Sequence, residues 1–238
     1  DGTGSLTEAE GGWQTIAPSA LPFEGLAAPV ALDEAGIAAL VRAFADSARR
    51  AVEAGFDFVE IHGAHGYLVH EFLSPLSNER TDAYGGDLAG RSRFLFEIVD
   101  AVRSEIPQDM PLLVRLSATD WNDAGVTVPE TAELAALLGD RGVDLIDVST
   151  GGNVLADIPV GPGYQVPAAA EVRASSGVPV SAVGMIDEPK QAEQIVATGQ
   201  ADVAMIGREA LRDPNFALRA ARELRVDIDY VPRPYHRA

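Results

Sequence analysis

Three of the four histidines in this 238-residue chain fall within nine positions, next to a tyrosine. His62, His65 and Tyr67 follow a short apolar run and stand among glycine and alanine, whose small size lets another molecule approach the backbone. Neutral imidazole N–H groups can hold a carbonyl oxygen and stabilise negative charge that develops on it. A phenol can deliver a proton to carbon. The cluster therefore indicates a site that polarises a carbonyl compound, whereas His70, after two apolar residues, is expected to be mainly structural.

A charged residue interrupts another apolar run. Arg115 stands in the middle of Leu112–Leu116. A buried guanidinium is costly unless an anion accompanies it. Two interpretations remain open: a salt bridge inside the protein, to Glu60 or Asp147, or an arginine that faces an anionic group of a cofactor.

Two glycines follow the last two apolar runs. The first run leads into Gly184 and Met185, and the second leads into Gly207 and Arg208. In many barrel proteins the loops after strands 7 and 8 bind a phosphate through backbone N–H groups. Glycine permits close approach and Arg208 adds positive charge, so this pair of loops is a candidate phosphate site; simple turn glycines are the alternative.

The elements that position these residues can be predicted from the apolar pattern. Five short runs rich in Val, Ile and Leu show little alternation, as strands of a parallel sheet covered on both faces do. They span residues 56–61, 112–116, 145–148, 178–183 and 203–206. Helical stretches are expected at 33–54, 91–106, 129–141, 189–198 and 213–224. This alternation predicts an α/β fold with right-handed crossovers.

Five parallel strands are compatible with two arrangements. An open doubly wound sheet is disfavoured because no glycine-rich dinucleotide fingerprint is present. Polar residues gather after the ends of all five runs, as in a (β/α)8 TIM barrel. We therefore expect residues 33–238 to supply strands 4–8 of one barrel domain, with residues 1–32 as an irregular segment after strand 3. Strands 1–3 would lie upstream or on another chain, since bare parallel edges are unstable.

Composition narrows the function classes. The absence of cysteine excludes disulfides, thiolate catalysis and cysteine-ligated clusters. A net charge of −18 argues against nucleic acid or an anionic membrane as a partner, because both would repel an acidic surface. No apolar run reaches the ~18 residues of a membrane span. A cytoplasmic location fits these features.

Four short motifs carry a specific resemblance. They read HGAHGYL at 62–68, FLSPLSN at 72–78, RTDAYGG at 80–86 and RSRF at 91–94. Together they closely resemble the Old Yellow Enzyme family, above all its bacterial branch of YqjM-type and xenobiotic-reductase ene-reductases (NADPH dehydrogenases). The resemblance runs from about Trp13 to the C-terminus.

The resemblance implies a cofactor and a reaction. Family members bind FMN noncovalently at the C-terminal mouth of the barrel; NADPH reduces it, and an α,β-unsaturated carbonyl compound then accepts hydride at its β-carbon. By motif, His62 and His65 would bind the substrate carbonyl and Tyr67 would donate the proton. The implied cofactor-binding residues are Arg115 at the flavin ring and Gly184, Met185, Gly207 and Arg208 at the phosphate.

The end of the chain carries a further implied role. In this branch a C-terminal Tyr-x-Arg can reach the substrate site of a neighbouring subunit, and Tyr235-His236-Arg237 matches that pattern. Arg237 is thus a candidate substrate-binding residue, and a homo-oligomer is expected. A disordered tail is the alternative.

Two other functions were considered. A metal-dependent barrel hydrolase could use His62, His65 and a carboxylate, which metal analysis and chelation would detect. A cofactor-free fragment or interaction subunit would remain colourless when FMN is added.

Overall fold

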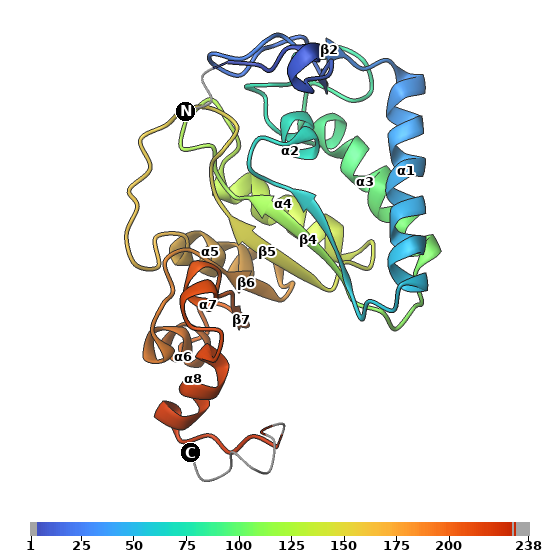
Figure 1. Cartoon of the computed structure of the whole chain (residues 1–238). Helices are drawn as coiled ribbons and strands as arrows, with labels where there is room; N and C mark the ends of the chain where they lie inside the picture. The colour runs from blue at the N-terminus through green and yellow to red at the C-terminus, as the bar shows by residue number, and fades with distance from the viewer. Residues whose placement is uncertain (1–3, 230, 232–238) are drawn as a thin grey trace.

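The structure is a computed structural model that describes residues 4–229 and 231. Its centre is a five-stranded parallel sheet whose strands are neighbours in chain order (Figure 1). The strands are β3 (Val59–Gly63), β4 (Leu112–Ser117), β5 (Leu145–Ser149), β6 (Val180–Ala182) and β7 (Val203–Ala204). The five predicted runs thus correspond to the five strands of this sheet, and the α/β class with a parallel sheet is confirmed.

The ends of several strands differ from the expectation. Phe56 and Phe58 were assigned to the first strand, but they precede β3 and are 66% and 55% exposed. Their side chains instead line a groove of about 530 Å³ between β3 and the preceding helix. At the other end of the sheet, β6 and β7 share only two register pairs, against five between β3 and β4.

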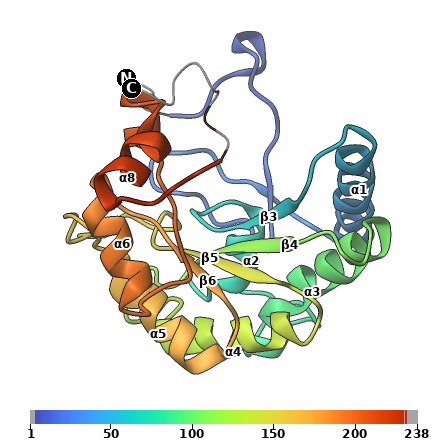
Figure 2. The ribbon, with the colours of Figure 1, turned by 90° about the horizontal axis from the view of Figure 1, so that it is seen from below.

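The helices lie along the outer side of the sheet. Figure 2 shows α1, α3, α4, α5 and α6 in an arc around the strands. The helices are α1 (Glu34–Glu53), α2 (Leu68–Leu73), α3 (Leu88–Glu105), α4 (Val128–Gly139), α5 (Val166–Ser176), α6 (Pro189–Ala197), α7 (Arg208–Arg212) and α8 (Phe216–Leu224), with a 3-10 turn at Glu8–Glu10. The sequence-based prediction missed α2, α5 and the short α7.

The sheet has two unlike faces. Residues that alternate along each strand pack against the helices, including the fully buried Leu112, Val114 and Ile146. The intervening positions form a row of polar residues across neighbouring strands, in the register His62, Arg115, Asp147, Ser181. The expectation that both faces of the sheet are apolar and covered is therefore wrong. One face of the sheet packs against the helices, and the other face carries the polar row.

The first 32 residues contain more regular structure than expected. The segments β1 (Ile16–Ala17) and β2 (Val30–Ala31) form a short parallel ladder. Arg80 ties this segment to the rest of the fold, because its Nη1 donates to the carbonyl oxygens of Pro18 and Leu32. Within the described residues, no helix is long and apolar enough to span a membrane.

Candidate active site

The structure brings the predicted histidines and tyrosine together at the end of β3. His62 is on the strand, and His65 and Tyr67 lie on the turn that leads into α2. The His62 ring centroid is 5.1 Å from that of His65 and 5.3 Å from that of Tyr67. Tyr67 is 64% exposed. The two imidazoles and the phenol, each able to donate a proton or a hydrogen bond, therefore lie close together at the end of β3.

The backbone of this turn is tightly constrained. His65 and Gly66 both have positive φ, at 61° and 75°. A Cβ atom on Gly66 would lie 2.1 Å from the carbonyl oxygen of Gly152, so the turn packs directly on the loop after β5. Ser117 links the same two loops: its hydroxyl accepts from the His65 N–H at 3.0 Å and donates to the Gly151 carbonyl at 2.8 Å.

The electrostatic surroundings keep both imidazoles neutral. Burial lowers the pKa of His65 to about 4, with further contributions from the positive charge of Arg115 and from His62. Burial and Arg115 also lower the pKa of His62. The Nε2 atom of His65 lies 2.7 Å from Ser149 Oγ. When Ser149 gives its single hydroxyl proton to Nε2 rather than to Gln165 Oε1, the proton of the neutral ring is on Nδ1, where it can be donated to a ligand.

Arg115 is paired with Asp147, one of the two partners proposed from the sequence. Its Nε is 3.0 Å from Oδ2 of Asp147, which is fully buried. Asp147 Oδ1 also accepts from Ser181 at 2.7 Å. The Arg115 side chain is 27% exposed and stands in register beside His62. The salt bridge thus pairs the two charges, although Arg115 Nε and Asp147 Oδ2 do not meet hydrogen-bond geometry, and the side chain still borders the polar face of the sheet.

The two candidate phosphate loops lie side by side. Met205 N donates to the Ala182 carbonyl at 2.8 Å, which continues the pairing of β6 and β7 towards Gly184 and Gly207. Gly184 is buried with φ 122°, and Met185 has φ 52°. Gly207 and Arg208 are exposed, and the Arg208 guanidinium makes no ion pair or hydrogen bond with the described residues.

Gln165 is a site-bordering residue that the sequence did not reveal. Its Nε2 donates to the Val183 carbonyl, and its Oε1 accepts from the Thr150 hydroxyl and lies 3.2 Å from Ser149 Oγ. The residue thereby joins the loop that contacts His65 to the start of the Gly184 loop. Nothing in its local sequence marks it, because its partners are 15 to 18 positions away.

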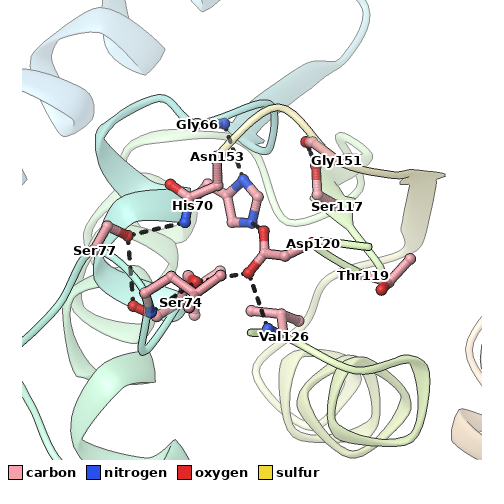
Figure 3. Close-up of polar contacts among 12 residues, drawn as sticks. Gly66, His70, Ser74, Ser77, Ser117, Thr119, Asp120, Val126, Gly151 and Asn153 are labelled. Carbon is pink, nitrogen blue, oxygen red and sulfur yellow. Dashed lines mark hydrogen bonds and ion pairs between the residues drawn. The ribbon is translucent and has the colours of Figure 1, made fainter. Parts of the chain in front are cut away.

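Three further predictions from the sequence concern His70, a metal site and Arg237. His70 is buried, as its structural interpretation requires, and contacts Gly66 and Asp120 (Figure 3). Among the described residues no group of three His, Cys, Asp or Glu side chains is arranged to hold a metal ion, so the hydrolase alternative gains no support. Arg237 lies outside the described residues.

Comparison with known proteins decides the family. A model of the NADH:flavin oxidoreductase / NADH oxidase family matches residues 14–227. The chain belongs to this family. It is 49% identical over 225 residues to an NADPH dehydrogenase of Geobacillus thermodenitrificans, covering 94% of this chain and 65% of that relative. It is 48% identical over 235 residues to the NADPH dehydrogenase of Bacillus subtilis, covering 98% of this chain and 68% of the relative.

Solved structures of the family have the same fold. A structure of 2-naphthoyl-CoA reductase matches with a TM-score of 0.83 and 28% identity, over 89% of this chain and 33% of that one. The Old Yellow Enzyme homologue of Zymomonas mobilis matches with a TM-score of 0.75 and 28% identity, over 92% of this chain and 64% of that one. The resemblance drawn from the motifs is thus confirmed, and FMN and NADPH are the cofactor and reductant that the family indicates. The chain spans 65% of the length of the Geobacillus relative.

Proposed function

We propose that the chain forms the carbonyl-binding and phosphate-binding side of an FMN-dependent, NADPH-consuming ene-reductase. The observation that carries this proposal is the cluster of His62, His65 and Tyr67, with His62 in register beside the partly exposed Arg115 and its buried partner Asp147. The family match supports the flavin, and the relatives named NADPH dehydrogenase support the reductant.

The residues present fit an FMN group. Arg115 offers a partly exposed positive charge on the polar face of the sheet, where it would lie at the electron-accepting ring. Gly184, Met185, Gly207 and Arg208 would hold the phosphate, because the two loops adjoin and Arg208 has no competing partner among the described residues. When bound, FMN supplies hydride transfer between the nicotinamide and the substrate.

The residues of the β3 turn would act on the substrate. Neutral His62 and His65 would donate N–H groups to the carbonyl oxygen of an enone, and so stabilise the negative charge that develops on it. The exposed Tyr67 hydroxyl would deliver a proton to the α-carbon. The structure holds the two imidazoles 5.1 Å apart, which suits them to converge on one oxygen atom.

Further strands that close a barrel would cover the polar face of the sheet. The edge of β3 is flanked by the apolar groove that includes Phe56 and Phe58. We propose that polypeptide beyond these 238 residues supplies barrel strands 1–3, and that a homo-oligomer places the Arg237 segment of one subunit at the site of its neighbour. The share of the relatives that this chain spans supports the first part.

One experiment tests the proposed function. FMN is added to the full chain together with a polypeptide for the missing strands, and the visible flavin bands and NADPH-dependent reduction of 2-cyclohexenone are recorded. Tyr67→Phe should slow enone reduction by about 10²-fold or more, because it removes the acid. Tyr84→Phe is the matched control, since that hydroxyl contacts Glu97 away from the site. A colourless protein, or equal rates for both variants, would contradict the proposal.

A further inference from the structure

A buried imidazole–carboxylate pair lies directly behind the β3 turn. His70 is 1% exposed and Asp120 is fully buried. His70 comes from the first turn of α2, whereas Asp120 comes from the loop after β4, 50 positions further along the chain. Figure 3 shows the His70 ring between the Gly66 N–H on one side and the Asp120 carboxylate on the other. Neither side chain takes part in the mechanism proposed above.

The hydrogen bond to Gly66 fixes the protonation state of the ring. The Gly66 N–H donates to His70 Nδ1 at 2.9 Å, so Nδ1 must carry its lone pair. The ring proton then belongs on Nε2, which lies 3.0 Å from Asp120 Oδ1. Neither of these two buried atoms has a partner among the described residues that meets hydrogen-bond geometry, so the 3.0 Å contact between them is the only polar contact that either makes there.

The Asp120 carboxylate is itself firmly held. Its Oδ2 accepts from the Ser74 hydroxyl at 2.6 Å and from the Val126 N–H at 2.9 Å. Burial alone would raise the pKa of Asp120, but the hydrogen bond and electrostatic contribution of His70, with the hydrogen bonds from Ser74 and Val126, outweigh it and lower the pKa. An ionised carboxylate at this position favours a ring with its proton on Nε2, the form that can accept from Gly66.

Gly66, whose N–H is held by His70, lies between two residues of the candidate site. Gly66 separates His65 from Tyr67, and Tyr67, the N-cap of α2, makes no side-chain cap hydrogen bond. His70 is the third residue of α2, and its side chain reaches back to a backbone N–H just before the helix, in the manner of the reciprocal half of a capping box. The contact therefore sets where the turn enters the helix.

We propose that Asp120 and His70 are positioning residues, in which Asp120 selects the imidazole tautomer that holds the Gly66 N–H and thereby fixes His65 and Tyr67 for the reaction. The catalytic part of this statement rests on the proposed function, whereas the tautomer and the loop contact do not. A carboxylate that orients an imidazole is a recurrent device in enzymes, here directed at a backbone N–H rather than at substrate.

The tautomer is tested directly on the full chain. Two-bond ¹H–¹⁵N correlation spectra of the imidazoles distinguish protonated from unprotonated ring nitrogens, and a His70→Asn variant assigns the signals of His70 among the four histidines. We expect a proton on Nε2 and none on Nδ1. A proton on Nδ1, alone or with one on Nε2, would overturn the proposal whether or not the protein reduces enones.

Two variants of His70 distinguish a role for its hydrogen bond to Gly66 from a role of the side chain in packing alone. In His70→Asn the side-chain oxygen occupies the place of Nδ1 and can still accept from Gly66, whereas His70→Leu offers no acceptor. Hydrogen exchange of the Gly66 amide should accelerate about fivefold or more in His70→Leu, since a hydrogen bond contributes about 1 kcal/mol. In His70→Asn it should stay close to that of the unaltered chain; equal acceleration in both variants would contradict the proposal.

The reaction gives the last readout. With FMN and the barrel-completing polypeptide, we expect kcat/KM for the enone to fall about tenfold or more in His70→Leu and Asp120→Asn, and to recover most of that loss in His70→Asn. Ser74→Ala, which removes a hydrogen bond to Asp120 but leaves the His70 contact, is the control for lost stability. Unchanged kcat/KM in His70→Leu would refute the positioning role, while an inactive unaltered protein would refute only the proposed function.

Discussion

The turn after β3 and the loops after β6 and β7 carry the two halves of the candidate site, and they are built very differently. The β3 turn is held by Ser117, by His70 and by direct packing of Gly66 on Gly152. The loops after β6 and β7 follow strands with two register pairs, and Arg208 beyond them is exposed. The proposed carbonyl-binding half is thus held by contacts within this chain, whereas in the proposed phosphate-binding half Gly184 is buried but Gly207 and Arg208 are exposed.

The difference predicts that the β3 turn contributes more to the free energy of unfolding than the loops after β6 and β7. Substitutions in the β3 turn should unfold or distort the chain, whereas substitutions at the β6 and β7 loops should affect ligand binding with little loss of stability. Four substitutions, ordered by expected effect, test this contrast.

The strongest test is Gly66→Ala. A Cβ here would overlap the Gly152 carbonyl oxygen at 2.1 Å, in a backbone with positive φ. We expect a loss of about 3 kcal/mol or more in the free energy of unfolding, measured by urea denaturation of the full chain. The control is Gly177→Ala, which has a similar φ of 72° but no atom within 4 Å, and should cost only about 1 kcal/mol. Similar losses for both would show that the Gly66–Gly152 contact is not tight.

Beneath the turn, Arg115→Met should leave the buried Asp147 carboxylate without its cation. We expect a loss of about 2 kcal/mol, below the full value for a buried pair because Arg115 is partly exposed. Adding Asp147→Asn to this variant should restore most of the loss, since the remaining buried group is then neutral. A double variant no more stable than Arg115→Met would show that the ion pair does not determine stability here.

A pH-dependent test uses Glu71 on α2. Burial raises the pKa of Glu71 to about 7 from the ordinary 4.5, so the folded chain binds this proton more tightly than the unfolded chain. The resulting stability is present below pH 4.5 and is lost as the pH rises from 4.5 through 7. Glu71→Gln should therefore stabilise the chain at pH 8 by about 1 kcal/mol, after allowance for solvent screening, and should change little at pH 4.5. Equal effects at both pH values in thermal unfolding would contradict this.

The smallest effect on stability is expected from Arg208→Gln. Because its guanidinium has no partner among the described residues, we expect a change below about 0.5 kcal/mol. With the barrel-completing polypeptide, affinity for FMN should fall about tenfold, whereas affinity for riboflavin, which lacks the phosphate, should not change. Equal weakening of both ligands in fluorescence titrations would place Arg208 away from the phosphate.

Features that are local in the sequence could be predicted, and features that depend on distant register could not. His62, His65 and Tyr67 are close in the chain, so their association was visible before the fold was known. The partner of Arg115 remained open until the register of β4 and β5 placed Asp147 beside it. The contact of His65 with Ser149 joins residues 84 positions apart.

The secondary structure shows the same limit. Phe56 and Phe58 extended the predicted first strand because an apolar run does not reveal where strand pairing begins. The α5 segment is rich in alanine and serine and lacks a strong apolar stripe, so it was missed. Its signals were Pro167 in the first turn and the C-cap Gly177, which mark helix ends independently of hydrophobic period.

The order of the sheet also has a consequence for how the chain acquires its structure. Each strand from β3 to β7 pairs with the strand that comes next in the sequence, so no pairing skips a strand. Parallel pairing across a helix is slower than hairpin formation, but this order lets each new strand–helix unit dock during synthesis on the one already made. Assembly on the ribosome can therefore proceed from β3 towards β7, with the β3 turn in place before the loops after β6 and β7 emerge.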